Sequence, residues 1–474
     1  MYIKHLRLDN FGPFPAVDLD FAPTTAAASN VTVLIGSNGA GKTSVLKALA
    51  ISLSWFVARL RSEKSNGAAI DDSLVYNSAA SAAISVIAGL EANFAWSIAK
   101  TRAGRKGDHA SQLLELKDLT EVFKQQLGNN ENSSLPLIAF YPVERTVLDI
   151  PLKIKQRHTF SQLDGYDNAL HQGVDFRRFF EWFREREDFE NEVLRPTALL
   201  EAIDKDAGNV LRIIESINGS GKRMELLEDG DLNALQDELK RVSEAFQLMQ
   251  SVQATNDTQL HAVRTAISNF MPGFSKLQVK RKPRLHMSIN KNGQTLNVAQ
   301  LSQGEKSLMA LVGDIARRLA ILNPGMDNPL LGKGIVLIDE VDMHLHPQWA
   351  RPLIERLTTT FPHCQFILST HSPLVISDCK DVLVYALENG HLSVVPSQYG
   401  QDANTVLLEV MDTHVRNASV ASRLGKLLDL IQDHQLDAAR AALAELNAEL
   451  PPHNIELLKA GLLLRKEELR SAKN

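Results

Sequence analysis

The sequence predicts an α/β fold in which a core is interrupted by a helical insertion and followed by a helical C-terminal tail. A buried strand over residues 31–35 leads through a glycine-rich loop into a helix that runs towards Leu60. A second apolar strand over 335–338 ends in two acidic residues. The segment 150–275 and the segment 396–474 place apolar side chains at helical spacing, so both are predicted to be helical.

The order of these patterns divides the 474 residues into four segments. Strands and one helix fill the N-terminal part of the core, and further strands return after the insertion. We call the α/β core the head, because its two parts are expected to fold together. The predicted segments, in chain order, are the N-terminal part of the head (1–149), the helical insertion (150–275), the C-terminal part of the head (276–395) and the helical tail (396–474).

The spacing of apolar residues predicts individual elements in each segment. Phe179, Phe180 and Phe183 follow Phe176 at helical spacing, which predicts a buried aromatic helix face, with a partner surface as the alternative. Asn292-Gly293 predicts a hairpin turn. The other predicted elements are strands over 1–7, 84–88, 94–100, 135–141 and 276–289, and helices over 113–127, 232–249, 260–270, 418–430, 436–446 and 455–469.

Composition restricts the class of protein. The 44% hydrophobic and 23% charged fractions are ordinary for a soluble globular chain, and no apolar run approaches the ~18 residues of a membrane helix. The first residues alternate apolar and basic side chains, as a strand does and a signal peptide does not. Cys364 and Cys379 are too few for a disulfide framework and lack metal-site spacing. The sequence therefore predicts a cytoplasmic protein with reduced thiols and no membrane partner.

A net charge of −5 argues against binding nucleic acid over the whole surface, but it allows a local basic face. Two clusters of basic residues each have two interpretations. They are either solvated strand ends and turns or patches that face DNA. The clusters are Lys276, Lys280, Arg281, Lys282 and Arg284, and Arg102, Arg105 and Lys106.

The glycine-rich loop has the full pattern G-x-x-x-x-G-K-[ST] of a phosphate-binding loop. Glycines allow tight turns that aim backbone N–H groups at phosphate oxygens, and the following helix N-terminus adds partial positive charge. At these positions Lys42 reaches the β- and γ-phosphates, and the Thr43 hydroxyl binds Mg²⁺. The sequence therefore predicts ATP and Mg²⁺ as cofactors. The predicted nucleotide-binding residues are Gly36, Ser37, Asn38, Gly39, Ala40, Gly41, Lys42, Thr43 and Ser44.

The apolar strand over 335–338 carries Asp339 and Glu340 at its C-terminal end. A carboxylate in this position binds Mg²⁺ directly or through water, so Asp339 is predicted as a metal ligand together with Thr43. The neighbouring Glu340 is placed to accept a proton from the attacking water and is predicted to be the catalytic base. With the phosphate loop, these residues predict an ATPase in which Lys42 and Glu340 are catalytic.

Residues 301–307, with the letters L-S-Q-G-E-K-S, precede a helix and resemble the signature loop of ABC and SMC-like ATPases. The resemblance implies an ABC-ATPase-like head in which Ser302 and Gly304 contact the γ-phosphate bound by a second copy, and therefore a homo-oligomer of at least two chains. Gln303 and Glu305 depart from the family's usual glycine and glutamine, which leaves the side-chain contacts open. An ordinary N-capped helix start is the alternative.

An apolar strand delivers His371 to the same region. A lone histidine there is usually structural, but its distance from Asp339 along the chain suits the switch histidine of this family. The resemblance therefore implies a catalytic role for His371 in sensing the γ-phosphate. The segment 342–347 resembles the D-loop of the family, and its two histidines lack a third ligand at the spacing that a metal site needs.

The long insertion separates SMC-like, RecF-like and OLD-like ATPases from transporter domains, in which the signature loop follows the phosphate loop much sooner. Over nearly its whole length the sequence resembles the ATPases of the Septu anti-phage systems, which also occur as retron effectors. The stretches that carry this resemblance are 141–145, 182–187, 301–307, 338–347 and 399–402.

This resemblance implies an anti-phage defence complex. ATP-driven assembly of the chain would scaffold and regulate a partner HNH nuclease that acts on nucleic acid, either phage DNA or retron msDNA. Two other functions fit the motifs as well. One is an SMC/RecF-like DNA-repair clamp that binds DNA without a nuclease partner. The other is a sensor scaffold in which ATP is a structural ligand with almost no turnover.

Overall fold

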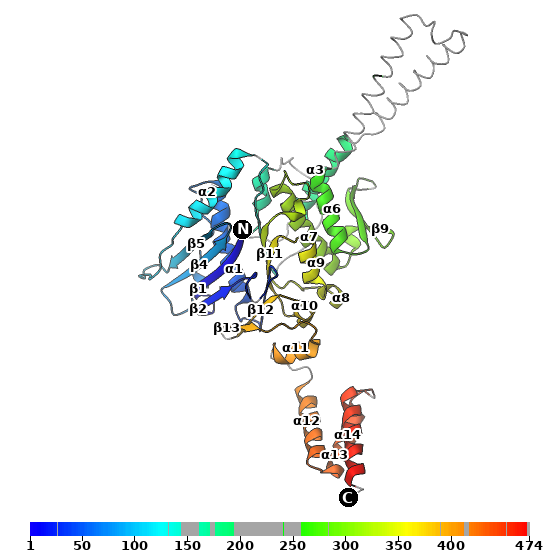
Figure 1. The fold of residues 1–474 in the computed structure, drawn as a ribbon. Coiled ribbons are helices and arrows are strands. Elements are labelled where there is room, and N and C mark those ends of the chain that lie inside the picture. Colours follow the sequence, from blue (N-terminus) through cyan, green and yellow to red (C-terminus); the bar gives the residue numbers. More distant parts are fainter. Residues whose placement is uncertain are drawn as a thin grey trace, which may run out of the picture. The chain divides into compact units, whose positions relative to one another are not determined.

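The structure is a computed structural model that forms two compact units, Met1–Gly400 and Gln401–Asn474 (Figure 1). Most of the predicted insertion, including the helix over 232–249, lies outside the described residues. The described residues are 1–143, 161–170, 176–193, 240, 257–411 and 417–471, apart from the single positions 26, 131, 283, 389 and 452.

Six strands form the central sheet of the first unit. They are β3 (Val31–Gly36), β6 (Leu137–Tyr141), β10 (Gly334–Ile338), β11 (Cys364–Ser369), β12 (Leu383–Glu388) and β13 (His391–Val395). Their order across the sheet is β13-β12-β3-β11-β10-β6, and every neighbouring pair except β13-β12 is parallel. The inner strands are buried, as their nearly continuous apolar runs require. Because β3, β11 and β10 are parallel neighbours, their carboxyl ends meet at one edge of the sheet.

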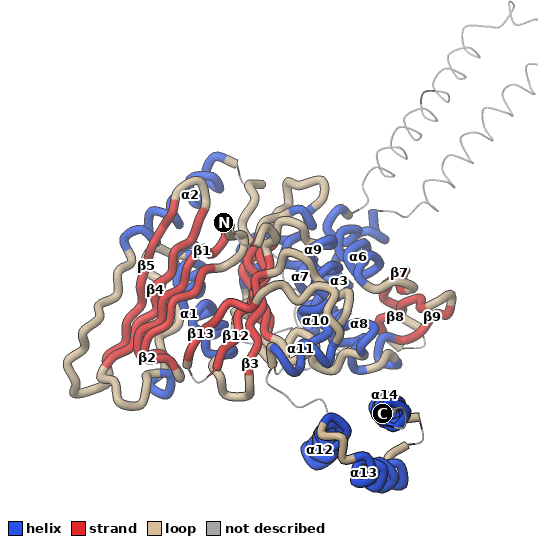
Figure 2. Tube along the Cα trace, turned by 60° about the horizontal axis from the view of Figure 1, so that its bottom comes forward, coloured by secondary structure: helices blue, strands red, loops and turns tan. Residues whose placement is uncertain are grey.

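A second sheet of four antiparallel strands confirms the strands predicted over 1–7, 84–88 and 94–100. Its strands are β1 (Tyr2–Phe11), β2 (Phe14–Asp20), β4 (Ser81–Gly89) and β5 (Asn93–Thr101), in the order β2-β1-β4-β5. Val86 lies opposite Trp96, and both side chains are buried, so they share the inner face of this sheet. Helix α1 (Lys42–Arg61) contacts strands of both sheets and lies between them (Figure 2).

Among the described residues, α1 is the one helix whose length and hydropathy would allow it to cross a membrane. Most of its apolar side chains are buried in the head, and Leu46, Leu49 and Leu53 are fully buried. Helix α2 (Leu114–Asn129), predicted over 113–127, packs against it through Phe56 and Phe123, whose ring centroids are 5.6 Å apart. The apolar composition of α1 is therefore that of a helix at the centre of a folded core.

Four helices pack together on the side of the central sheet away from α1 (Figure 2). They are α3 (Phe176–Val193), α6 (Thr258–Phe270), α7 (Gln303–Leu322) and α9 (Leu353–Thr360). Phe179, Phe180 and Phe183 are fully buried, which confirms the aromatic core face predicted for α3. The side chain of Phe176 lies outside the described residues.

A small three-stranded sheet follows α6 along the chain. It consists of β7 (Phe274–Lys280), β8 (His286–Lys291) and β9 (Gln294–Asn297). Asn292 and Gly293 join β8 to β9 with φ angles of 50° and 87°, which confirms the predicted hairpin turn. Two short helices, α8 (Pro347–Ala350) and α10 (Pro373–Ser377), follow β10 and β11.

The second unit is helical. It contains α11 (Ala403–Glu409), α12 (Ala418–Gln432), α13 (Leu436–Glu449) and α14 (Ile455–Ser471), and the last three confirm the predicted amphipathic segments. These three helices share one apolar core, formed by Leu424, Leu427, Ile431, Ala439, Leu446, Leu457, Ala460 and Leu464. The α/β class with a helical tail is thus confirmed, whereas the predicted boundaries at 149, 275 and 395 stay predictions.

Candidate ATPase site

The loop between β3 and α1 has a backbone that strongly favours glycine. Gly36, Gly39 and Gly41 have φ angles of 143°, 82° and 106°, in the region that L side chains rarely adopt. A Cβ on Gly41 would lie 2.3 Å from Cζ of Phe14, and one on Gly36 would lie 2.2 Å from the carbonyl oxygen of Leu387. The glycines therefore permit both the turn and its close packing. Ser37, Asn38 and Gly39 remain exposed at the tip of the loop.

Lys42, the first residue of α1, folds back under the loop. Its side chain is only 6% exposed. Its Nζ donates hydrogen bonds to the carbonyl oxygens of Gly36 at 2.9 Å and Ser37 at 3.1 Å. Burial lowers the pKa of Lys42, whereas the nearby carboxylates of Glu340 and Asp339 act in the opposite direction. The structure thus holds a cation inside the loop, where phosphate oxygens would offer it stronger acceptors than carbonyls.

Thr43 and Asp339 meet at the carboxyl edge of the central sheet. The Thr43 hydroxyl donates a hydrogen bond of 2.7 Å to Oδ2 of Asp339, although 296 positions separate the two residues. Asp339 is 1% exposed, and its backbone N–H donates to the carbonyl oxygen of Tyr141 at 2.8 Å. A hydroxyl and a carboxylate side by side are oxygen ligands of the kind that Mg²⁺ prefers. These two side chains fit the predicted metal site.

Ser369, the last residue of β11, binds both acidic residues at the end of β10. Its hydroxyl donates to Oδ1 of Asp339 at 2.5 Å and accepts the backbone N–H of Glu340 at 2.8 Å. Ser369 is fully buried. No sequence motif assigns Ser369 a role, and its position at the end of an apolar strand is the one signal that could have pointed to it. The pairing of β10 with β11 is what brings the hydroxyl to the two acidic residues.

Glu340 and His371 lie together at the rim of the site. Nε2 of His371 is 3.8 Å from Oε1 of Glu340, and the two side chains are 38% and 34% exposed. Glu340 has a φ of 45°, a left-handed conformation that is uncommon for residues other than glycine. After this turn the Val341 N–H donates to the carbonyl oxygen of Ser369 at 2.9 Å, so the chain lies beside the end of β11 that leads to His371. The structure therefore brings the predicted base and the predicted switch histidine to one place beside Lys42, Thr43 and Asp339.

Ser302 and Gly304 lie at the beginning of α7. Ser302 caps this helix: its hydroxyl accepts the N–H of Glu305 at 3.3 Å, and its own N–H donates to the Glu305 carboxylate at 3.0 Å. A Cβ on Gly304 would lie 2.6 Å from the carbonyl oxygen of His344, so the loop packs on the segment that follows Glu340. Within the described residues, the side chain of Ser302 forms its hydrogen bond with Glu305 and none with the phosphate loop. The contact predicted with a second copy stays a prediction.

A buried charged network lies beneath the site and links β6 to α7. The Tyr141 hydroxyl donates to Oδ2 of Asp314 at 3.0 Å, and the Arg317 and Arg318 guanidinium groups each approach Asp314 at 2.7 Å. All four side chains are at most 2% exposed. Burial acts to raise the pKa of Asp314, but Arg318 and Arg317 outweigh it and hold that pKa below its ordinary value. The backbone carbonyl oxygen of Tyr141 also accepts a hydrogen bond from the Asp339 N–H, so Tyr141 connects the site to Asp314 of α7.

The two predicted basic clusters contain residues with structural contacts. Arg102 donates to the carbonyl oxygens of Asn77 at 3.1 Å and Val75 at 3.0 Å, so it ties a turn together. Arg281 pairs with Asp188 of α3. These contacts explain Arg102 and Arg281 as parts of the fold. The DNA-facing interpretation stays a prediction for both clusters. Residues 144 and 145 of the predicted motif at 141–145 lie outside the described residues.

Comparisons with known proteins identify the family of the chain. Residues 5–247 match the family described as AAA domain, and residues 191–376 match the AAA ATPase domain. The chain is 36% identical over 407 residues to the retron Ec83 probable ATPase of Escherichia coli, covering 83% of this chain and 73% of that protein. It is 30% identical over 456 residues to the retron Vc95 probable ATPase of Vibrio cholerae serotype O1 biovar El Tor, covering 92% and 85%.

Two further similarities are weaker. A stretch of 113 residues is 36% identical to the Septu protein PtuA of Bacillus mycoides (strain KBAB4), covering 23% of this chain and 15% of that protein. The SMC head domain from Thermotoga maritima is 17% identical, with 84% of this chain and 99% of that chain covered and a TM-score of 0.38. The long matches decide the assignment: the chain belongs to the AAA ATPase family that includes these retron ATPases, and it is an ATPase.

Proposed function

We propose that this chain binds and hydrolyses ATP with Mg²⁺ as the ATPase subunit of a cytoplasmic anti-phage defence complex. The hydrogen bond of 2.7 Å between Thr43 and Asp339 is the main observation behind the catalytic part. It sets two oxygen ligands for Mg²⁺ next to the Lys42 ammonium, which is the arrangement that phosphoryl transfer needs. Glu340 and His371, 3.8 Å apart, place a base and a polar partner beside them.

The residues of the site would divide the reaction between them. Backbone amides of the loop 36–43 and the Lys42 ammonium bind the phosphates. Glu340 orients the attacking water and accepts its proton, and His371 contacts the γ-phosphate. Thr43 and Asp339 hold the Mg²⁺, which would neutralise charge on the phosphate oxygens.

A second copy of the chain is proposed to complete each site. Ser302 is exposed at the N-terminus of α7, and the partial positive charge of a helix N-terminus favours an anionic partner. Ser302 and Gly304 of one copy would contact the γ-phosphate bound by the other. Closure of the pair would then depend on ATP and reverse after hydrolysis, because these contacts exist only in the closed state. The minimum assembly would be a homodimer.

The test separates ATP binding from hydrolysis in the purified full-length chain. Lys42→Ala should lose ATP binding in a titration. Glu340→Gln should bind ATP but release phosphate about 100-fold more slowly or worse, the usual loss when a general base is removed. Lys47→Ala, which changes an exposed lysine of the same helix, should behave as the unmodified chain. Normal ATP binding by Lys42→Ala, or unchanged turnover by Glu340→Gln, would refute these assignments.

The defence role draws on the names of the relatives. The two long matches are retron ATPases, and the short match is a Septu protein. ATP-driven assembly of this chain would scaffold and regulate a partner HNH nuclease that acts on phage DNA or retron msDNA. Co-expression with the neighbouring genes, followed by purification and a DNA-degradation assay, tests this. ATP-dependent cleavage by a co-purified nuclease is the expected result. Retention of DNA by the isolated chain, with no nuclease in the complex, would favour the DNA-repair clamp instead.

A further inference from the structure

Helix α14 has a second apolar face that the core of its own unit does not use. Leu457, Ala460 and Leu464 point into the core shared with α12 and α13. The opposite face carries large apolar side chains that remain open to solvent. Their exposed fractions are 66% for Ile455, 57% for Leu458, 70% for Leu462 and 60% for Leu469. Exposed leucines are common one at a time, but a continuous row of them on one helix indicates a binding surface.

The row has the spacing of a coiled-coil seam. Ile455, Leu458, Leu462, Arg465 and Leu469 recur at alternating intervals of three and four residues. This is the a/d pattern of a heptad repeat, in which each side chain inserts between four residues of a facing helix. We call these five residues the α14 seam. Leu463, 44% exposed, lies outside the seam. The other exposed apolar residues of α14 form a narrow strip, as a helix–helix contact requires, rather than the broad apolar face of a helix that lies in a membrane surface.

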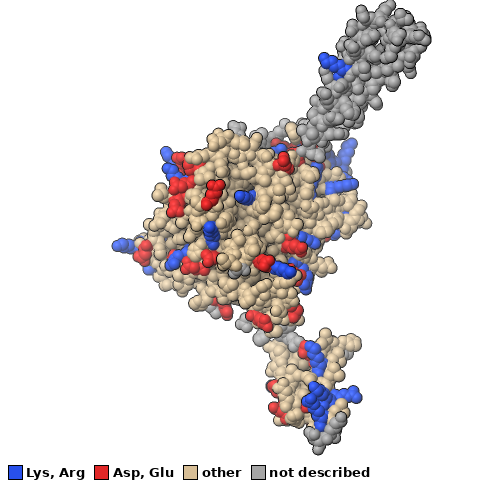
Figure 3. All heavy atoms as spheres, viewed as in Figure 1, with Lys and Arg blue, Asp and Glu red and all other residues tan. Residues whose placement is uncertain are grey.

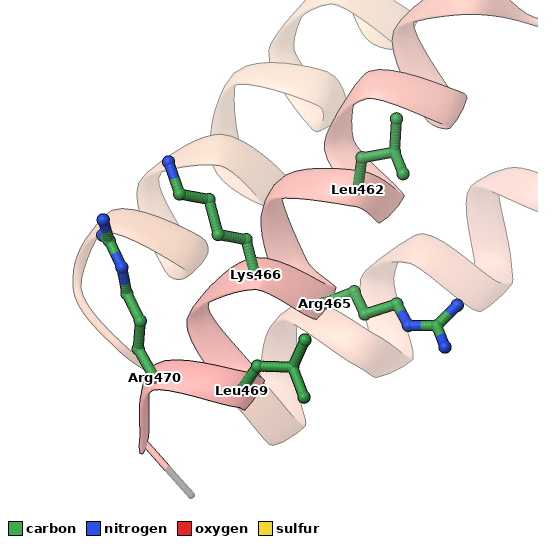
Figure 4. A pocket seen from close by; sticks show the side chains of 5 residues that line it. All are labelled: Leu462, Arg465, Lys466, Leu469 and Arg470. Atoms are coloured by element: carbon green, nitrogen blue, oxygen red, sulfur yellow. The ribbon is translucent and has the colours of Figure 1, made fainter. Parts of the chain in front are cut away.

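Positive charge lies within and beside the seam. Leu462, Arg465, Lys466, Leu469 and Arg470 line a shallow hollow of about 350 Å³ on the outer side of α14 (Figure 4). Lys and Arg gather on one side of the second unit in the space-filling view (Figure 3).

The acidic residues of α14 are already engaged within the unit. Glu468 pairs with Arg440 of α13 at 2.6 Å, and Glu467 pairs with Arg470 at 2.8 Å. Within the described residues, no carboxylate lies within salt-bridge distance of Arg465 or Lys466. The positive charge of these two side chains is therefore available to a partner.

We propose that the α14 seam docks an acidic amphipathic helix of a partner protein. Apolar side chains of that helix would fill the seam, and its flanking carboxylates would pair with Arg465 and Lys466. The charges disfavour a second copy as the occupant. In a parallel pair of α14 helices Arg465 would face Arg465, and in an antiparallel pair, where a positions face d positions, it would face an apolar seam residue and no carboxylate. This proposal does not depend on the nucleotide chemistry of the head.

The test uses the full-length chain and a synthetic helical peptide of three heptads, with Leu at the a and d positions and Glu at e and g. Fluorescence anisotropy should detect its binding. Leu462→Ser should weaken binding at least about tenfold, because one buried leucine is worth that much or more. Lys466→Glu should weaken binding of this peptide and improve binding of a control peptide with Lys at e and g. Leu428→Ser, which changes a partly exposed leucine of α12 outside the seam, should leave binding unchanged.

Three results would overturn the proposal. The first would be that the Glu peptide fails to bind, or that the Lys peptide binds the unmodified chain equally well. The second would be self-association of the chain in sedimentation that Leu462→Ser abolishes, which would make a second copy the occupant. The third would be binding to phosphatidylglycerol vesicles that requires Leu462, which would make the seam a membrane contact. Helix content by circular dichroism and ATP binding should be unchanged in Leu462→Ser, which separates lost docking from lost folding.

Discussion

The backbone N–H of Glu340 donates a hydrogen bond of 2.8 Å to the hydroxyl of Ser369, and the same hydroxyl donates to Asp339. One buried serine on β11 therefore orients both acidic residues at the end of β10. Asp339 also accepts from Thr43, so the positions of the phosphate loop, β10 and β11 are coupled through three side chains. A displacement of Ser369 would alter the predicted metal ligand and the predicted base together.

Ser369→Ala should lower kcat for ATP hydrolysis by about tenfold, because a lost buried hydrogen bond is worth roughly 1–1.5 kcal/mol. ATP affinity should change little, since Lys42 and the loop are untouched. Ser369→Thr keeps the hydroxyl and should retain most of the activity. Steady-state phosphate release with a separate binding titration checks this. Equal losses in the Ala and Thr variants would show that packing, and not the hydroxyl, matters at this position.

Gly304→Ala should impair the proposed contact between two copies. A Cβ at this position would lie 2.6 Å from a backbone oxygen of His344, so the start of α7 must shift. We expect ATP binding to persist, while ATP hydrolysis and ATP-dependent association both fall. Gly425→Ala is the matched control: it adds a methyl group to a helical glycine with open space around it, and should stabilise the chain by about 0.5–1 kcal/mol. Full activity in Gly304→Ala would contradict the predicted role.

Asp314→Asn should destabilise the head most strongly near neutral pH. The folded-state pKa of Asp314 is depressed, so its contribution is present above the unfolded pKa of about 3.9 and is lost as pH falls through the folded value. At pH 7 the variant leaves two buried arginines without their anion, which should cost about 3–5 kcal/mol. Urea unfolding at several pH values measures this. The difference in free energy of unfolding between the unmodified chain and Asp314→Asn should become smaller below about pH 4. A difference that does not change with pH would contradict the assignment.

Neither cysteine should react in the folded chain at pH 8. Burial raises the pKa of Cys364 to about 12 and that of Cys379 to about 11, and only the thiolate is reactive. A disulfide reagent should therefore label both thiols only after urea is added. When the pH is raised in native conditions, Cys379 should react first, because its pKa is lower and it is 8% exposed against 1% for Cys364. Rapid labelling of Cys364 at pH 8 would contradict its burial.

Much of the fold followed from local patterns. The glycines of the loop 36–43 need their backbone conformation whatever surrounds them, so the strand, loop and helix were predictable together. Asn292-Gly293 determines its hairpin for the same reason. The helices over 418–469 were visible because each carries an apolar face at helical spacing. Ser302 shows the limit of local patterns: the structure shows that it caps α7, and its residue type fits equally the nucleotide contact proposed with a second copy.

The sequence by itself determined many of the described elements, the conformation of the glycine-rich loop and the residues predicted to perform ATP chemistry, because glycine conformation, periodicity and side-chain type are local properties. Only the tertiary structure decided which residues meet. β11 lies between β3 and β10 in the sheet although it follows both in the chain, and that order is what brings Ser369 to Asp339 and Glu340. The packing of α14 against α12 and α13 likewise decided which of its apolar faces is exposed. Leu457 and Leu462 have the same side chain, but Leu457 is buried in the core and Leu462 is open to solvent.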